Sequence, residues 1–201
     1  MEMTLRWYGS KFDTVTLSQI RQIPGVTGVI TTLYDTAPGE VWSRERIAAL
    51  KAEVAAAGLH ISGIESVNVH DAIKTGAPDR DFYIDNYIQT LENLGKEDIH
   101  LVCYNFMPVF DWTRTELARK RPDGSTVLAY TQEAVDAINP EEMFASIAGD
   151  TNGTIMPGWE PERMAHIKEL FAMYEDIDDE KLFENLKYFL EALMPTCREC
   201  D

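Results

Sequence analysis

The sequence predicts an α/β protein built around a parallel sheet. Four short apolar segments rich in β-branched residues alternate along the chain with segments whose apolar residues recur every three or four positions. The first pattern is typical of buried strands and the second of amphipathic helices. Right-handed crossovers turn this alternating order into a parallel sheet covered by helices.

The strands are expected at residues 5–8, 25–33, 60–66 and 98–106. The first is short and apolar. The second begins directly after Pro24, in a proline-glycine pair that marks a turn. Since consecutive strands are separated by helical segments, each pair is expected to be parallel.

The helices are expected between these strands. The first covers residues 17–23 and closes at Pro24. Ser43 can cap the first turn of the second helix and Gly58 can end it, whereas the third ends at Gly95. The apolar stripes of the second and third helices are Ile47, Leu50 and Val54, and Ile84, Tyr87, Ile88 and Leu91.

The last helix begins near Asp179, so that about seventy residues separate it from the fourth strand, where roughly two to six are usual. Within a single domain of residues 1–201, residues 107–178 are therefore expected to form a long insertion or lid. Residues 121–126, RPDGST, have the composition of a hairpin turn. An amphipathic helix is expected over residues 164–174.

Composition limits the partners of the chain. It has 201 residues, 45% of them hydrophobic, and a formal net charge of -16 from 34 acidic and 18 basic residues. This charge disfavours nucleic acid and anionic membranes, but not a small anionic substrate held in a locally basic pocket. No apolar run approaches the roughly 18 residues of a membrane span. The N-terminus lacks the pattern of a signal peptide, and three cysteines do not suggest a disulfide framework, so a cytoplasmic protein is expected.

Polar and aromatic residues gather where the predicted strands end. In parallel α/β folds, ligands bind at the carboxyl ends of the strands, where the connections to the helices begin. The sequence therefore predicts a ligand site at this edge of the sheet. The predicted substrate-binding residues are Arg6, Trp7, Tyr8, Glu65, His70, Asn105 and Trp112.

Most of these residues have a structural alternative. Arg6 can form an ion pair with a neighbour, His70 can cap or brace its loop, and Trp7 can belong to the core. Glu65 is costly to bury without a partner, which favours a pocket role. Asn105 is poorly explained by strand packing and also favours a pocket.

The segment LVCYNFMPVFDW, residues 101–112, is expected to leave a strand that is covered on both faces. Its aromatic residues are expected to form a pocket wall, because solvent-exposed loops rarely need them. Cys103 is expected to be a small buried residue. Cys197 and Cys200 have the Cys-x-x-Cys spacing of metal or redox sites, but one such pair without a nearby histidine is a weak signal.

Six segments, in one order along residues 3–200, resemble the mannonate dehydratase family: LRWYGS, IRQIPGVTGV, GIESVNVHDAIKTG, RDFYIDNY, LVCYNFMPVFDWTRT and MPGWEPERM. The resemblance implies a (β/α)8 TIM barrel related to xylose-isomerase-like enzymes. It implies a metal-dependent hydro-lyase that converts D-mannonate to 2-keto-3-deoxy-D-gluconate in hexuronate and glucuronate catabolism. It also implies a divalent manganese or iron ion (Mn2+ or Fe2+) and a homo-oligomer at full length.

The resemblance covers only part of the family's length, because its members are considerably longer. The chain is therefore expected to be the N-terminal half of the barrel, with four parallel strands, and to be inactive alone. The family's metal ligands and proton-transfer residues have no matching position, so no catalytic residue is assigned and no metal ligand is expected in this chain. Arg6 is the candidate for the substrate's carboxylate, and Glu65, His70 and Asn105 are candidates for its hydroxyls.

Two other functions stay open at this point. A sugar isomerase or epimerase can be built on the same barrel, because fold alone does not determine the reaction. A half barrel can also be a non-catalytic interaction module. Turnover of D-mannonate without isomerisation of aldoses distinguishes the dehydratase from the isomerase.

Overall fold

The computed structural model describes residues 2–109, 114–136 and 167–200. The chain divides into two compact units, which are described one at a time. The first consists of Met1–Pro108 and Met173–Asp201, and the second of Val109–Ala172.

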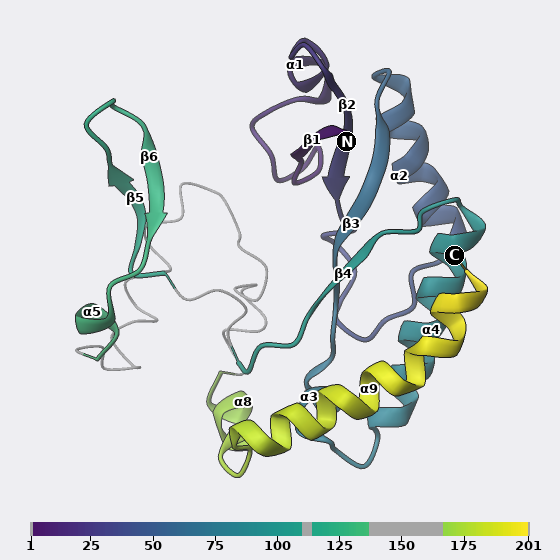
Figure 1. The fold of residues 1–201 in the computed structure, drawn as a ribbon, viewed down its shortest axis with the longest axis vertical. Helices are drawn as coiled ribbons and strands as arrows, with labels where there is room; N and C mark the ends of the chain where they lie inside the picture. The colour runs from purple at the N-terminus through teal and green to yellow at the C-terminus, as the bar shows by residue number, and fades with distance from the viewer. Residues whose placement is uncertain (1, 110–113, 137–166, 201) are drawn as a thin grey trace. The chain divides into compact units, whose positions relative to one another are not determined.

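The first unit contains a four-stranded parallel sheet (Figure 1). Its strands are β1 (Met3–Arg6), β2 (Val26–Thr31), β3 (His60–Asn68) and β4 (Val102–Asn105), and they lie in sequence order. Within the described residues, β1 and β4 are the edges of this sheet. The predicted α/β class with four parallel strands is confirmed, and the order is that of consecutive strands in a TIM barrel.

The register of the sheet brings the carboxyl ends of the strands together. Arg6 at the end of β1 pairs with Ile30 of β2. Glu65 of β3 pairs with Cys103 of β4, and Asn105 pairs with Asn68. Because the strands are parallel, the last residues of all four lie at the same end of the sheet.

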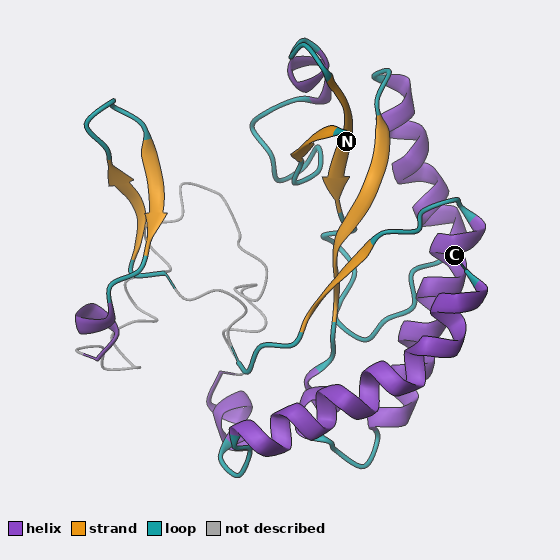
Figure 2. Cartoon of the chain, in the orientation of Figure 1, coloured by secondary structure: helices purple, strands orange, loops and turns teal. Residues whose placement is uncertain are grey.

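The longer helices of the first unit lie along one side of this sheet (Figure 2). The helices of the first unit are α1 (Leu17–Arg21), α2 (Arg44–Ala56), α3 (Asp71–Thr75), α4 (Arg80–Lys96) and α9 (Asp179–Glu199). Four of them correspond to the predicted helices, and the five-residue α3 is an addition. Among the helices that the structure describes, none is long and apolar enough to cross a membrane.

The last helix, α9, begins where the sequence predicts. The side chain of Asp178 caps it by accepting a hydrogen bond of 2.8 Å from the backbone N–H of Lys181. Asp179 and Glu180 occupy its first turn, where acidic side chains interact favourably with the positive end of the helix dipole. These local signals define the point at which the chain returns to the sheet.

The apolar core lies between the sheet and its helices in two clusters. Phe189 of α9 is 0% exposed and belongs to the cluster formed with β3, β4 and α4. The second cluster joins β1 and β2 to α1 and α2, and it contains Trp7, Val29 and Leu50. Burying an aromatic ring as large as that of Phe189 stabilises a fold by about 3 kcal/mol.

Tyr104 of β4 and Phe106, which follows the strand, both contact the Phe189 ring of this core. The ring centroid of Phe189 lies 6.2 Å from that of Tyr104 and 5.9 Å from that of Phe106. It lies 5.1 Å from that of Tyr87 in α4. Both rings turn toward α9, as alternation along the strand requires, although Tyr104 is 42% exposed. Their place in the wall of a substrate pocket stays a prediction. Phe110 lies outside the described residues.

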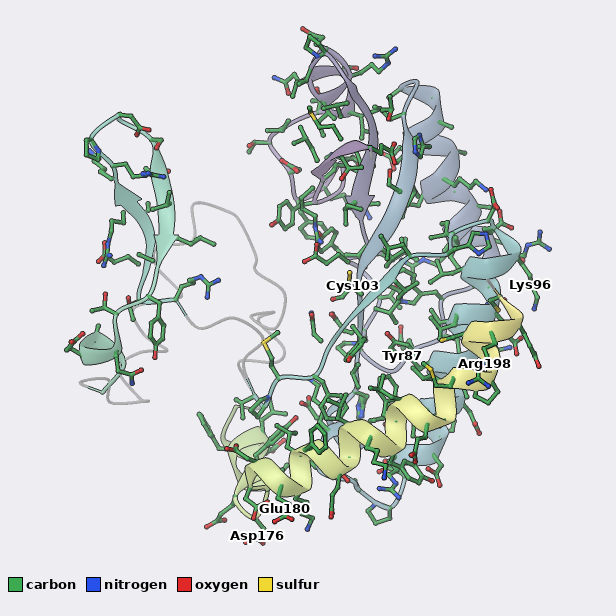
Figure 3. All side chains as sticks on the ribbon, in the orientation of Figure 1. Tyr87, Lys96, Cys103, Asp176, Glu180 and Arg198 are labelled. Carbon is green, nitrogen blue, oxygen red and sulfur yellow. The ribbon has the colours of Figure 1, made fainter. Side chains whose placement is uncertain are left out.

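Cys103 occupies the opposite side of the pleat and is exposed, not buried as predicted. Figure 3 shows Cys103 on β4 and Tyr87 between β4 and α9. Successive side chains of a strand point to opposite faces, so Cys103 and Asn105 share the face that turns away from the helices. Within the described residues, β4 is covered on one face, whereas the sequence suggested two.

The second unit contains an antiparallel hairpin of β5 (Glu116–Lys120) and β6 (Thr126–Ala129). Its turn includes Gly124 at φ 84°, a conformation that glycine adopts without steric cost. The predicted hairpin turn is confirmed. α5 (Gln132–Asp136) follows the hairpin, and α8 (Ile167–Tyr174) confirms the described part of the predicted amphipathic helix.

Candidate functional site

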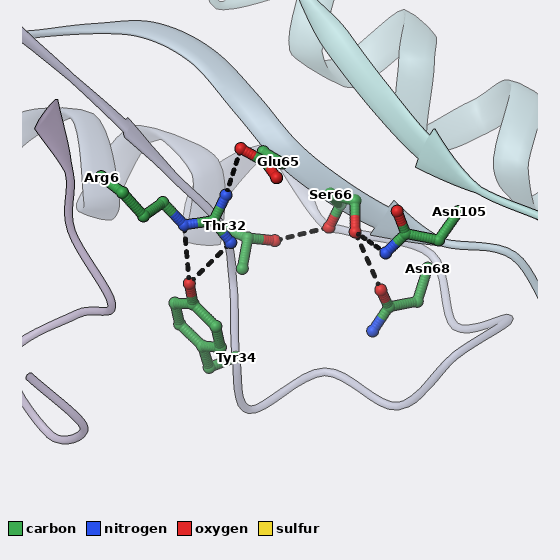
Figure 4. A network of polar contacts seen from close by, with 7 residues as sticks. All are labelled: Arg6, Thr32, Tyr34, Glu65, Ser66, Asn68 and Asn105. Carbon is green, nitrogen blue, oxygen red and sulfur yellow. Dashed lines mark hydrogen bonds and ion pairs between the residues drawn. The ribbon is translucent and has the colours of Figure 1, made fainter. Parts of the chain in front are cut away.

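Arg6, at the end of β1, is the centre of one polar cluster (Figure 4). Its Nη1 lies 2.8 Å from Oε2 of Glu65. Its Nε and Nη2 both donate to the hydroxyl oxygen of Tyr34, at 3.2 Å and 2.9 Å. Its Cζ lies 5.1 Å from the centroid of the Tyr8 ring, within the range of a cation–π contact. The structure thus brings together three predicted site residues and adds Tyr34.

Ser66 is the centre of a second cluster beside the first (Figure 4). Its Oγ accepts a hydrogen bond of 2.7 Å from Nδ2 of Asn105 and donates one of 3.0 Å to Oδ1 of Asn68. Its backbone carbonyl accepts a hydrogen bond of 2.7 Å from Oγ1 of Thr32. Because Glu65 and Ser66 are adjacent in β3, the two clusters link the carboxyl ends of all four strands.

The charged groups of the Arg6 cluster are partly exposed. The side chain of Arg6 is 21% exposed and that of Glu65 is 38% exposed. Both are therefore half-buried, so their charges are screened less than those of surface ion pairs. Such an arrangement offers N–H donors, a carboxylate acceptor and an amide within one small area, which suits a polyhydroxylated anion.

Burial and charge change the acidity of two neighbouring groups. Burial raises the pKa of Tyr34 to about 12, although the Arg6 guanidinium opposes the shift. Partial burial also raises the pKa of the Cys103 thiol, and the Glu65 carboxylate adds to the shift. Both groups therefore keep their protons at neutral pH, so neither is a ready base or nucleophile.

His70 takes the structural role that was its alternative. Its Nδ1 accepts a hydrogen bond of 3.2 Å from the backbone N–H of Ala72, which caps α3. Its ring stacks on that of Tyr83 with a centroid separation of 3.6 Å. The histidine therefore braces the connection that follows β3, and its contact with a substrate stays a prediction.

Of the two tryptophans predicted to bind the substrate, the structure describes only Trp7. Trp7 is 2% exposed and packs in the cluster between β1, β2 and their helices. It faces the side opposite Arg6, as alternation along the strand requires. Its role as a wall of the substrate site stays a prediction. Trp112 lies outside the described residues.

Sequence analysis missed Tyr34 and did not select Ser66. A signal for Tyr34 was present, because Thr32, Leu33 and Tyr34 directly follow β2, as Tyr8 follows β1. The predicted site residues all come from the ends of the first, third and fourth strands. The same strand-end rule, applied to the second strand, would have found Tyr34.

The described residues do not form a metal site. Among them, no group of three or more histidine, cysteine, aspartate or glutamate side chains is arranged to hold a metal ion. Cys197 lies in α9 and Cys200 follows its end, where the backbone carbonyl of Cys200 lies 2.6 Å from Nδ1 of His100. No step of a reaction is therefore assigned to a metal held by these residues.

Comparison with known proteins identifies the family. The sequence model described as D-mannonate dehydratase (UxuA) matches residues 1–201. The chain belongs to the D-mannonate dehydratase family. The resemblance of its six sequence segments is thereby confirmed.

Similar proteins support this assignment. Mannonate dehydratase from Brachyspira hyodysenteriae is 65% identical over 199 residues, which are 99% of this chain and 56% of that protein. Mannonate dehydratase from Thermotoga maritima is 52% identical over 201 residues, which are 100% of this chain and 56% of that protein. The crystal structure of mannonate dehydratase from Streptococcus suis superposes with a TM-score of 0.81 at 42% identity, over 100% of this chain and 51% of that one. The chain spans about half the length of the relatives it matches.

Proposed function

We propose that this chain forms the sugar-acid-binding half of a D-mannonate dehydratase. The observation that carries the proposal is the polar network at the carboxyl ends of four parallel strands, in a chain that belongs to this family. Ligands of parallel α/β folds bind at this edge. The reaction removes the proton beside the substrate's carboxylate and expels the hydroxyl of the next carbon as water, which leaves 2-keto-3-deoxy-D-gluconate.

The residues of this chain bind and orient the substrate in this proposal. The remaining N–H groups of Arg6 donate to the carboxylate, and Glu65 accepts hydrogen bonds from substrate hydroxyls. Asn105, held by Ser66, contacts a hydroxyl from the end of β4. Positioned donors of this kind count most where negative charge grows in the transition state, which here is the carbon beside the carboxylate.

The remaining features follow from the family and are part of the same proposal. A divalent metal ion, Mn2+ or Fe2+, stabilises the developing negative charge when bound. Its ligands and the proton-transfer residues come from outside this chain. The enzyme acts in hexuronate catabolism in the cytoplasm, and at full length it is a homo-oligomer. Residues 107–178, the insertion that follows β4, act as a lid in this proposal.

Turnover by the full-length enzyme, that is, this chain extended to the length of its relatives, tests the proposal. We expect it to convert D-mannonate to a 2-keto-3-deoxy acid, detected by NMR, and to leave D-mannose and D-fructose unchanged. Isomerisation of these sugars without dehydration of D-mannonate would assign the barrel to a sugar isomerase.

A further inference from the structure

The hydroxyl of Tyr34 has an unusual position beside Arg6. Its oxygen accepts two hydrogen bonds from one guanidinium, from Nε at 3.2 Å and from Nη2 at 2.9 Å. A phenol oxygen that accepts two bonds still carries its own O–H as a donor. Tyr34 is therefore arranged to hold Arg6 with its lone pairs and to donate a proton elsewhere.

That proton has no acceptor among the residues that the structure describes. The ring is held in place, because its centroid lies 5.7 Å from those of both Tyr8 and Phe12. The hydroxyl is half-buried, and burial keeps its pKa well above neutral, so it stays protonated under ordinary conditions. A fixed and protonated donor in a partly desolvated site calls for an acceptor, because an unmade hydrogen bond there is costly.

The electrostatics of the Arg6 cluster determine how an anionic acceptor is held. Oε2 of Glu65 lies 2.8 Å from Nη1 of Arg6, so the positive charge of the guanidinium is largely offset. Attraction by net charge is then weak, and a carboxylate must be held by directed hydrogen bonds. A phenol that accepts bonds from a cation is itself polarised toward donation, which strengthens its bond to an anion.

We propose that Tyr34 donates its hydroxyl proton in a hydrogen bond to the carboxylate of the sugar acid, alongside Arg6. The inference rests on the proposed function, because it takes the carboxylate to bind at Arg6. Tyr34 has two tasks: it orients the guanidinium and it supplies a second donor. It is thus a residue that determines specificity for acids over neutral polyols.

Tyr34→Phe in the full-length enzyme tests this role, because it removes the hydroxyl and keeps the ring. We expect kcat/KM for D-mannonate to fall about ten- to a hundredfold, the range of a hydrogen bond to a charged group. The inhibition constant of D-gluconate should rise by a similar factor. That of D-mannitol, which has no carboxylate, should change less than about threefold, because a lost neutral hydrogen bond costs less.

Tyr188→Phe is the matched control. Tyr188 lies on α9, and its hydroxyl donates to Oδ1 of Asp81 at 3.0 Å on the surface. We expect no change in any of the three constants. If Tyr34→Phe weakens D-gluconate and D-mannitol equally, Tyr34 only braces the site, and the proposal is wrong. Unchanged affinity for the acids would also overturn it.

If the Tyr34→Phe protein does not fold, a second variant tests the proposal. Replacing Tyr34 by 3,5-difluorotyrosine keeps its shape but makes the phenol more acidic. As the pH is raised, affinity for D-gluconate should then be lost at a lower pH than in the wild type, since only the protonated phenol donates. If both proteins lose affinity for D-gluconate at the same pH, the proposal is contradicted. If the wild-type enzyme does not dehydrate D-mannonate, the proposed function fails, whereas D-gluconate binding still decides the role of Tyr34.

Discussion

The two faces of the four-stranded sheet carry different side chains, although the same strands supply both. Toward the helices, β3 and β4 present Ile64, Tyr104 and the neighbouring Phe106, which pack around Phe189. Away from the helices, the same two strands present Glu65 and Asn105. One face is apolar and closely packed, and the other is polar and open in the described residues.

The apolar face is expected to stabilise the fold, whereas the polar face is expected to bind the ligand. Apolar side chains that leave water stabilise the fold in proportion to the area they bury. Polar side chains on the open face contribute little to folding, because hydrogen bonds within the protein replace hydrogen bonds to water. Substitutions on the helix side should therefore lower stability, and substitutions on the open face should lower activity. Three substitutions in the full-length enzyme test this separation, from the largest effect to the smallest, and metal binding to the chain of residues 1–201 follows them.

The largest effect is expected on the helix side. Phe189→Ala should lower the free energy of unfolding by about 3–5 kcal/mol, because it leaves a cavity among the surrounding rings. Phe183→Ala is the control: this residue lies on the same helix and is 67% exposed. Its effect should stay within about 0.5 kcal/mol. Urea denaturation measures both, and equal losses would show that Phe189 is not central to the core.

A large effect on activity is expected at Arg6. Arg6→Ala should lower kcat/KM for D-mannonate roughly a hundred- to a thousandfold, because it removes donors to the carboxylate and leaves Glu65 without its ion pair. Arg44→Ala removes another ion pair, in which Nε of the exposed Arg44 lies 2.5 Å from Oε1 of Glu97, away from the carboxyl ends of the strands. Steady-state kinetics should show less than about a twofold change there. Similar losses in the two variants would argue against a substrate contact at Arg6.

A smaller effect is expected at Ser66, which acts through its neighbours. Ser66→Ala removes the hydroxyl that holds Asn105, so kcat/KM should fall about three- to tenfold, with a loss of about 1 kcal/mol in stability. Ser62→Ala, on the same strand but away from its carboxyl end, should leave kinetics unchanged. Steady-state kinetics measures kcat/KM of both variants, and thermal unfolding measures their stability. A Ser66 variant with wild-type kinetics would show that Asn105 needs no such support.

The smallest effect is expected from metal ions added to the chain of residues 1–201. The described residues contain no group that could hold a metal, so manganese or iron should bind no better than to any acidic surface. Isothermal titration calorimetry should show no stoichiometric site. One site of micromolar or tighter affinity would contradict this and would direct attention to Glu65, His70 and the cysteines.

The strand and helix order could be predicted from the sequence, because each element has a clear periodicity. The cap at Asp178 and the glycine after α2 are local signals, and both lie close to where the sequence predicts the boundaries. α3 was missed because five residues are too few to show a helical period.

The site could be located from the sequence, but its contacts could not. The strand-end rule found Arg6, Glu65 and Asn105, which the structure gathers in adjoining clusters. It could not show which side of the pleat each residue of β4 would face, since that depends on where the helices pack. For this reason the sequence did not show that the Tyr104 ring contacts Phe189 of α9, and it predicted a buried thiol where Cys103 is exposed.

Asn105→Ala in the full-length enzyme tests the central claim most directly, because Asn105 lies on the open face, next along the strand to Tyr104, whose ring contacts α9. Turnover of D-mannonate should fall roughly ten- to a thousandfold, as expected when one positioned polar contact is lost. The free energy of unfolding should change by less than about 1 kcal/mol. Cys103→Ser, exposed on the same face, should change both quantities little. An Asn105→Ala protein that is strongly destabilised, yet fully active in its folded fraction, would contradict the separation of binding from stability between the two faces.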